Sequence, residues 1–75
     1  MNRKDALKRA NGLAPQIEEH LDKIGDNPAS RDVPHWMREV RAWIGQIEAM
    51  LPHLGQKTAE DWARRIEGWR ARIGG

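Results

Sequence analysis

A repeated tryptophan pattern constrains the fold of this chain more than any other sequence feature. Segments 36–47 and 62–73 each begin with tryptophan, then place a β-branched residue four positions on, a tryptophan three further on and an isoleucine four further on. Steps of four, three and four return to one face of an α-helix. All 4 tryptophans lie in these two segments. The repeat therefore predicts two amphipathic helices with aromatic stripes.

Antiparallel packing of these two helices would place each tryptophan ring opposite a branched aliphatic side chain. In that register Trp43 lies opposite Ile66 and Trp69 lies opposite a valine. Layers of unequal side chains fill an interior without voids. We therefore expect Trp43 and Trp69 to be largely buried. The predicted core consists of Ile17, Leu21, Trp36, Val40, Trp43, Ile47, Trp62, Ile66, Trp69 and Ile73.

The first third of the chain also has helical periodicity. Apolar residues recur at steps of three and four from Leu7 to Ile24, which predicts a helix over about 3–24. Pro15 interrupts it, because proline has no N–H to donate to the carbonyl of Asn11 and its ring crowds that carbonyl. The stripe keeps its phase across the proline. This favours one kinked helix over a short helix followed by a new one that starts at Pro15.

Turn-forming residues separate this helix from the next. The stretch 25–34 is rich in Gly, Asp, Asn and Pro, which favour turns over helix. Pro34 fits the first turn of a helix, where no N–H donor is needed. Pro52 should end the same helix, since the residue before a proline disfavours helical geometry. The second helix is therefore expected over about 33–51.

The third helix has its own start signal. Thr58 and Asp61 stand three residues apart and resemble a capping box, which predicts a helix over about 59–73. Three apolar stripes joined by one long and one short loop cover one another best in an up-down-up arrangement. We expect an all-α, antiparallel three-helix bundle in which residues 1–75 form a single helical domain.

Composition supports a small helical domain. The 75 residues suffice for one domain, and 32% charged with 39% apolar residues is typical of a folded helical chain. The absence of cysteine excludes disulfides, thiolate metal sites and a cysteine nucleophile. No apolar run approaches the length of a membrane span, and no basic-then-apolar leader precedes the first helix. We therefore expect a cytoplasmic protein with no membrane association.

Histidine is the residue type to test first for metal binding. His20, His35 and His53 are scattered over a helix face, a helix start and a turn. No HExxH motif and no histidine pair four residues apart supports a metal site. We interpret the three histidines as solvated or capping residues, and we expect neither a metal nor another cofactor.

Catalytic residues are not indicated either. Ser30 and Thr58 occupy positions typical of helix caps rather than of nucleophiles. Glu18, Glu19 and Asp22 form an acidic cluster, but paired carboxylates act in acid–base catalysis only where burial separates their pKa values. These three lie away from the apolar stripe and are expected to face solvent. The sequence thus predicts a protein that is not an enzyme.

Arginine provides the only functional signal. Six arginines lie off the apolar seam of the second and third helices and form a candidate contact surface for a partner or for phosphates: Arg38, Arg41, Arg64, Arg65, Arg70 and Arg72. An antiparallel hairpin would bring Arg70 and Arg72 near Arg31, His35 and Arg38. Glutamates are interleaved with them, and cations in the last helical turn also suit the helix dipole.

Three interpretations of this basic surface remain open at the sequence level. It can be a solvated face, a surface for an acidic protein, or a site for nucleic-acid phosphates. A second basic cluster, formed by Arg3, Lys4, Lys8 and Arg9, is expected at the opposite end of the bundle. Two separated clusters fit a nucleic-acid groove less well than one continuous stripe.

The function predicted from the sequence is that of a small, non-enzymatic protein-interaction module with an unidentified protein partner. The alternative is a small nucleic-acid-binding or regulatory protein that uses the arginine-rich end of the second and third helices. Four apolar side chains fit a three-helix core least well and could support a weak self-contact: Leu13, Met37, Met50 and Leu51. We expect a monomer or a weak homodimer.

Overall fold

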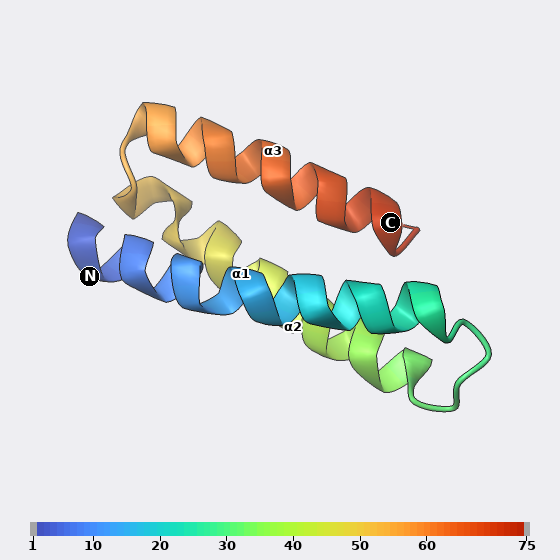
Figure 1. Cartoon of the computed structure of the whole chain (residues 1–75). Coiled ribbons are helices and arrows are strands. Elements are labelled where there is room, and N and C mark those ends of the chain that lie inside the picture. The colour runs from blue at the N-terminus through green and yellow to red at the C-terminus, as the bar shows by residue number, and fades with distance from the viewer. Residues whose placement is uncertain (1, 75) are drawn as a thin grey trace.

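The fold is an all-α three-helix bundle, as predicted from the apolar stripes (Figure 1). The computed structural model describes residues 2–74. Its helices are α1 (Arg3–Asp26), α2 (Val33–Met50) and α3 (Gln56–Arg72), and a short 3-10 turn, η1 (Leu51–His53), follows α2. No strand occurs within these residues. The bundle is elongated, with extents of 40 × 18 × 15 Å.

Helix α1 continues through Pro15 as one helix, which confirms the preference for one helix over two. Pro15 and Asn11 are both exposed, so water can satisfy the carbonyl that the proline leaves without a donor. The helix begins at the N-cap Asn2, whose side chain accepts the backbone N–H of Asp5 at 2.8 Å. It ends at Asp26, slightly later than expected, and the Asn27 N–H caps the Lys23 carbonyl at 2.9 Å.

Helix α3 begins at Gln56, earlier than the predicted capping box. Its N-cap is Gly55, whose φ of 80° lies in the left-handed region that favours glycine. A Cβ at this position would lie 3.3 Å from the guanidinium carbon of Arg3. The Thr58 hydroxyl accepts a long hydrogen bond of 3.4 Å from Arg3 instead of capping the helix. The capping-box prediction is wrong because the buried Leu54 and the glycine after it reverse the chain first.

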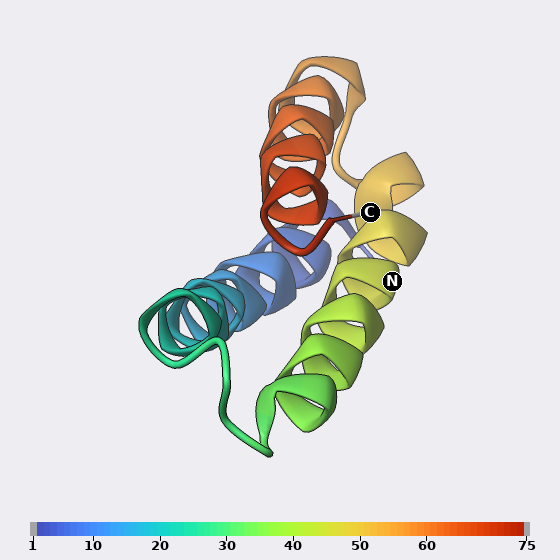
Figure 2. The same cartoon turned by 90° about the vertical axis from the view of Figure 1, so that its right-hand side faces the viewer.

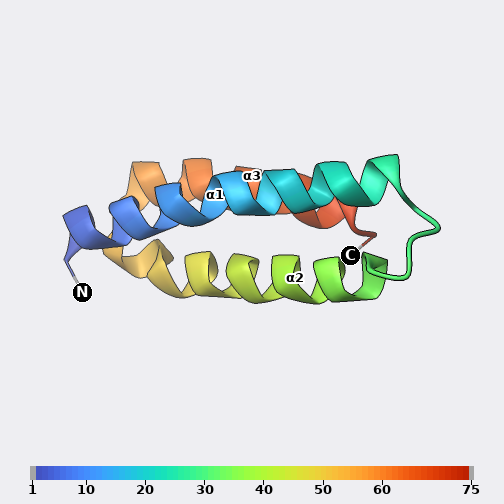
Figure 3. The same cartoon turned by 60° about the horizontal axis from the view of Figure 1, so that its bottom comes forward.

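Helices α1 and α2 run side by side along their length (Figure 3). The side of α1 that enters the core carries Ala6 and Ala10, both fully buried, and the nearly buried Ala14. Small side chains let two helix backbones approach closely. The backbone of α3 approaches α1 closely at far fewer places than α2 does. Large rings fill the wider space, because Trp62 and Trp69 of α3 are both buried.

The buried core differs from the predicted set at two tryptophans. Trp36 and Trp43 are only partly buried, and Trp36 does not belong to the core cluster. Ile44 of α2 is buried although it lies outside the predicted stripe. The remaining predicted core residues are buried: Ile17, Leu21, Val40, Ile47, Trp62, Ile66, Trp69 and Ile73.

Alanines of α1, two residues of α2 and one residue of the turn before α3 complete the interior. Ala6, Ala10, Ala14, Ile44, Met50 and Leu54 are buried in addition to the predicted set. Leu13, Met37 and Leu51 pack against the core while staying partly exposed, whereas Met50 is buried. Within residues 2–74 no helix combines the length and the apolar character needed to cross a membrane.

Candidate interaction surface

Arg65, Arg70 and Arg72 of α3 contact carboxylates of the neighbouring helices. Arg70 makes a two-pronged contact with Glu48 of α2, in which Nη1 donates to Oε2 at 2.8 Å and Nη2 donates to Oε1. This hydrogen bonding lowers the pKa of the Glu48 carboxyl from its ordinary value and raises that of the Arg70 guanidinium. Arg70 therefore serves as a link between α2 and α3.

Three further arginines of α3 also have acidic partners. Arg72 Nη2 donates to Asp22 Oδ1 of α1 at 3.0 Å, and Arg64 pairs with Asp61 of its own helix. Arg65 lies 3.6 Å from a carboxylate oxygen of Glu18 on α1. Its guanidinium carbon also lies 4.3 Å from the ring centre of Trp62 and 5.2 Å from that of Trp69. Much of the positive charge of α3 is thus neutralised at its contacts with α1 and α2.

The predicted arginine surface does not form one unpaired patch. Arg70 and Arg72 contact Glu48 and Asp22, so neither is available to join Arg38 in the way the hairpin register suggested. Arg38 and Arg41 are exposed on α2 and have no ion pair among the residues that the structure describes. Of the six arginines that the sequence predicted as a contact surface, only these two have no carboxylate partner within the described residues.

A cluster of two histidines and one glutamate joins α1 to α2. His20 Nε2 lies 2.8 Å from Glu39 Oε2, and His35 Nε2 lies 2.7 Å from Glu39 Oε1. The His20 ring packs edge-on against Trp43, with centroids 4.8 Å apart. Its side chain is only 16% exposed, and its Nδ1 is buried without a partner in the described part of the chain.

This cluster changes the interpretation of His20, which the sequence assigned to solvent. The ring instead fills a place at the α1–α2 contact, and Glu39 satisfies one of its nitrogens. Spacing alone could show the contact between His35 and Glu39, four residues apart on one helix. It could not show His20, which comes from another helix. No group of acidic, histidine or cysteine side chains within residues 2–74 is arranged to hold a metal ion.

The seam between α1 and α2 is covered by α3 on one side only (Figure 2). On the other side, α1 contributes Arg9, Leu13 and His20, while α2 contributes partly exposed tryptophans. The Lys23 ammonium lies 5.9 Å from the ring centre of Trp36 at one end of this side. We call this side the open seam and define it by Arg9, Leu13, Gln16, His20, Lys23, Trp36, Trp43, Gln46, Met50 and His53.

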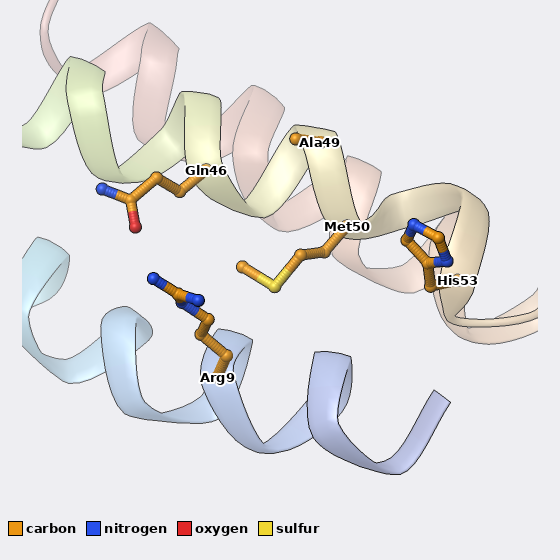
Figure 4. A pocket seen from close by; sticks show the side chains of 5 residues that line it. All are labelled: Arg9, Gln46, Ala49, Met50 and His53. Atoms are coloured by element: carbon orange, nitrogen blue, oxygen red, sulfur yellow. The ribbon is translucent and has the colours of Figure 1, made fainter. Parts of the chain in front are cut away.

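A hollow of about 300 Å³ lies at the end of the open seam near the start of α1. Figure 4 shows Arg9 and Gln46 pointing toward each other from α1 and α2, with the Met50 side chain between the two helices. Ala49 and His53 complete the lining. Arg9 makes no ion pair within the described residues, so its guanidinium presents free N–H donors at this hollow.

A second hollow lies on the other side of Arg9. It has a volume of about 450 Å³ and is lined along α1 by Asp5, Lys8, Arg9, Gly12, Leu13 and Gln16. The two hollows share Arg9, which belongs to the second basic cluster of the sequence. The structure therefore places free positive charge beside open apolar surface at the start of α1. Sequence patterns identified the charge but not its neighbours on α2.

Comparisons with known proteins found no similarity from which a function could be inferred. No protein-family model, no curated protein and no solved structure matches this chain.

Proposed function

We propose that this protein is a small, non-enzymatic interaction module that binds a protein partner along the open seam. The observation that supports the proposal is the combination of partly exposed Trp43 and Leu13 with the two hollows beside Arg9. Aromatic, methionine and arginine side chains are enriched at protein–protein interfaces. The open seam presents partly exposed tryptophan and exposed arginine side chains, and Met50 lines one of its hollows.

The helical framework suits such a role because the contacts that position the seam lie on its inner side. Ala10 and Ala14 bring α1 against α2, and Val40, Ile44 and Ile47 are buried behind the open seam. A surface held by packed helices needs little ordering when it binds, which reduces the entropic cost of association.

A pair of matched variants tests this proposal. Leu13→Lys places a charge in the open seam. The control Ala42→Lys places the same charge at an exposed position of α2 that does not belong to the open seam. Affinity capture from the native cell extract should recover a partner with wild-type protein and with Ala42→Lys, but not with Leu13→Lys. Ala42→Lys should melt close to the wild type because its site is exposed, whereas Leu13→Lys should remain folded but melt lower because Leu13 packs partly against the core. Equal capture by the two variants would contradict the use of this seam.

Nucleic-acid binding is the second proposal, and the free cations Arg38 and Arg41 favour it. Phosphate binding weakens steeply with salt, by orders of magnitude between about 50 and 200 mM when several phosphates are contacted. An anisotropy titration with duplex and single-stranded oligonucleotides at these two concentrations separates the proposals. We expect no binding at the lower salt concentration, because most arginines of α3 already have carboxylate partners.

A further inference from the structure

We propose that the hollow formed by Arg9, Gln46 and Met50 is the anchor point for a carboxylate side chain on an amphipathic helix of the partner. This inference rests on the proposed interaction function and specifies the chemistry of the partner. It follows from the free charge, the donors in the hollow and the apolar surface beside it.

Charge distribution is the first step. Arg64, Arg65, Arg70 and Arg72 all have carboxylate partners, whereas Arg9 has none among the described residues. Lys4 and Lys8 of the same helix also make no ion pair there. Asp5 is the one carboxylate that α1 places beside these cations at its start, so this end of the helix keeps a net positive charge. An acidic partner complements this charge and gains in association rate and in specificity.

The donors in the hollow are the second step. The guanidinium of Arg9 carries N–H donors and no acceptor, and the side-chain amide of Gln46 lies opposite it with its oxygen turned toward Arg9 (Figure 4). A half-turn of this exposed amide would present its NH₂ group to an incoming carboxylate. A carboxylate offers two oxygens to such an arrangement, and hydrogen bonds to a charged acceptor are stronger than neutral ones. Met50 lies below them and is only 5% exposed, so the methylene stem of an acidic residue would rest on an apolar floor.

The surroundings of the hollow favour a helix as the carrier of that carboxylate. Leu13 lies one helical turn along α1 from Arg9, and Trp43 lies one turn along α2 from Gln46. Both side chains are partly exposed and pack against the core. An amphipathic helix presents apolar residues at steps of three and four, which fits a groove between two helices. One acidic residue at the edge of its apolar face would then reach Arg9.

A peptide titration of the full chain tests this inference. The probe is a designed helical peptide of about 14 residues, roughly 21 Å long, with leucines at steps of three and four and glutamates beside them. A matched peptide carries glutamine in place of every glutamate. Heteronuclear NMR should show saturable shifts of the Gln46 side-chain amide, the Met50 methyl and the Trp43 indole with the acidic peptide. The glutamine peptide should bind at least about tenfold more weakly.

Two variants localise the effect. Arg9→Gln should weaken the acidic peptide by about tenfold or more, because it removes the charged donor. Arg38→Gln removes an equally free cation from α2 and should change the affinity less than about twofold. Equal losses in the two variants, equal binding of the two peptides, or no shifts up to about 1 mM peptide would overturn the carboxylate anchor.

The outcomes also separate this inference from the proposed function. Shifts confined to Leu13 and Trp43, with Arg9→Gln binding as the wild type does, would overturn the anchor while leaving the seam as an interface. Shifts of the Arg9 and Gln46 signals by an oligonucleotide at about 200 mM salt would assign the hollow to phosphate instead and overturn a protein partner there. Loss of capture by Leu13→Lys, in contrast, concerns the seam as a whole.

Discussion

The α1–α2 contact and the attachment of α3 use side chains of opposite size. Between α1 and α2 the backbones lie close, and α1 contributes the buried alanines Ala6 and Ala10. Helix α3 stands further away and contributes the buried rings of Trp62 and Trp69. One contact thus depends on the absence of bulk, and the other depends on its presence.

The polar interactions of the two contacts also differ, because one is largely buried and the others are exposed. At the α1–α2 contact, His20 is largely buried and is held by Glu39. At the edges of α3, the ion pairs between Arg70 and Glu48 and between Arg72 and Asp22 join exposed side chains. Exposed ion pairs contribute little to stability, typically under about 1 kcal/mol each. The comparison teaches that α3 is held by buried side chains, the two rings together with Ile66 and Ile73, whereas α1 and α2 are held by close fit.

Removal of a ring from α3 should have the largest effect. Trp69→Ala is expected to lower the free energy of unfolding by about 3–5 kcal/mol, because a buried aromatic side chain is lost and a cavity remains. Trp43→Ala should cost less, about 1–3 kcal/mol, since this ring is partly exposed. Total stability for a chain of this length is about 5–10 kcal/mol. Urea denaturation of both variants measures the difference, and an equal loss would show that α3 does not depend on its rings.

An increase in bulk should damage the other contact. Ala10→Leu is expected to cost about 1–3 kcal/mol, because the added methylenes have no space between α1 and α2. Ala42→Leu makes the same change at an exposed site of α2 and should lie within about 0.5 kcal/mol of the wild type. Thermal melting followed by circular dichroism compares them. If Ala10→Leu left the melting temperature unchanged, the contact between α1 and α2 would have space for a larger side chain.

His20 and His35 both contact the carboxylate of Glu39, but the first is largely buried and the second is exposed. His20→Ala should cost about 1–2 kcal/mol, because it removes both the hydrogen bond to Glu39 and the ring contact with Trp43. His35→Ala removes the other contact of Glu39, but the side chain is 64% exposed, so a loss under about 0.5 kcal/mol is expected. Chemical denaturation near neutral pH provides both values. A larger loss for His35→Ala than for His20→Ala would show that the contact of Glu39 within α2 stabilises more than its contact with α1.

The ion pair of α3 should have the smallest effect and a distinct pH dependence. The pKa of Glu48 is lowered in the folded state, so its contribution is present above the ordinary pKa of a glutamate and is lost as the pH falls through the folded-state value. Glu48→Gln should therefore destabilise by at most about 0.5 kcal/mol at pH 7, after allowance for solvent screening, and not at all well below about pH 4. Unfolding curves at both pH values check this. A larger loss at acidic pH would contradict the sign.

Helix positions were predictable because apolar periodicity is a property of each segment alone. The same periodicity could not rank residues within a stripe. Trp36 and Trp62 share a place in the repeat, yet Trp62 is buried and Trp36 is not, because burial depends on where the neighbouring helices lie. The buried alanines of α1 were also underestimated. Their importance comes from the close approach of another backbone, which one stripe does not reveal.

The candidate surface was less predictable than the fold. Free arginines and paired arginines look alike in a sequence, since Arg70 and Glu48 are 22 positions apart and belong to different helices. The cluster at the start of α1 was visible as charge, but Gln46 and Met50 carried no signal that linked them to Arg9. Register between helices decides both outcomes, and a few tenths of a kilocalorie per surface contact leave little trace in the pattern of residue types.

The course of the chain also sets how the bundle would respond to mechanical force. Helix α3 runs parallel to α1, so the start of α1 and the end of α3 lie toward opposite ends of the long axis (Figure 1). A pull on these two points would slide α3 along its neighbours instead of peeling it away from one end. In this geometry the contacts of Trp62, of Trp69 and of the α3 arginines bear the force together, so we expect them to break at the same force. If the start of α1 and the end of α2 were pulled apart instead, we expect the two closely packed helices to separate one turn at a time.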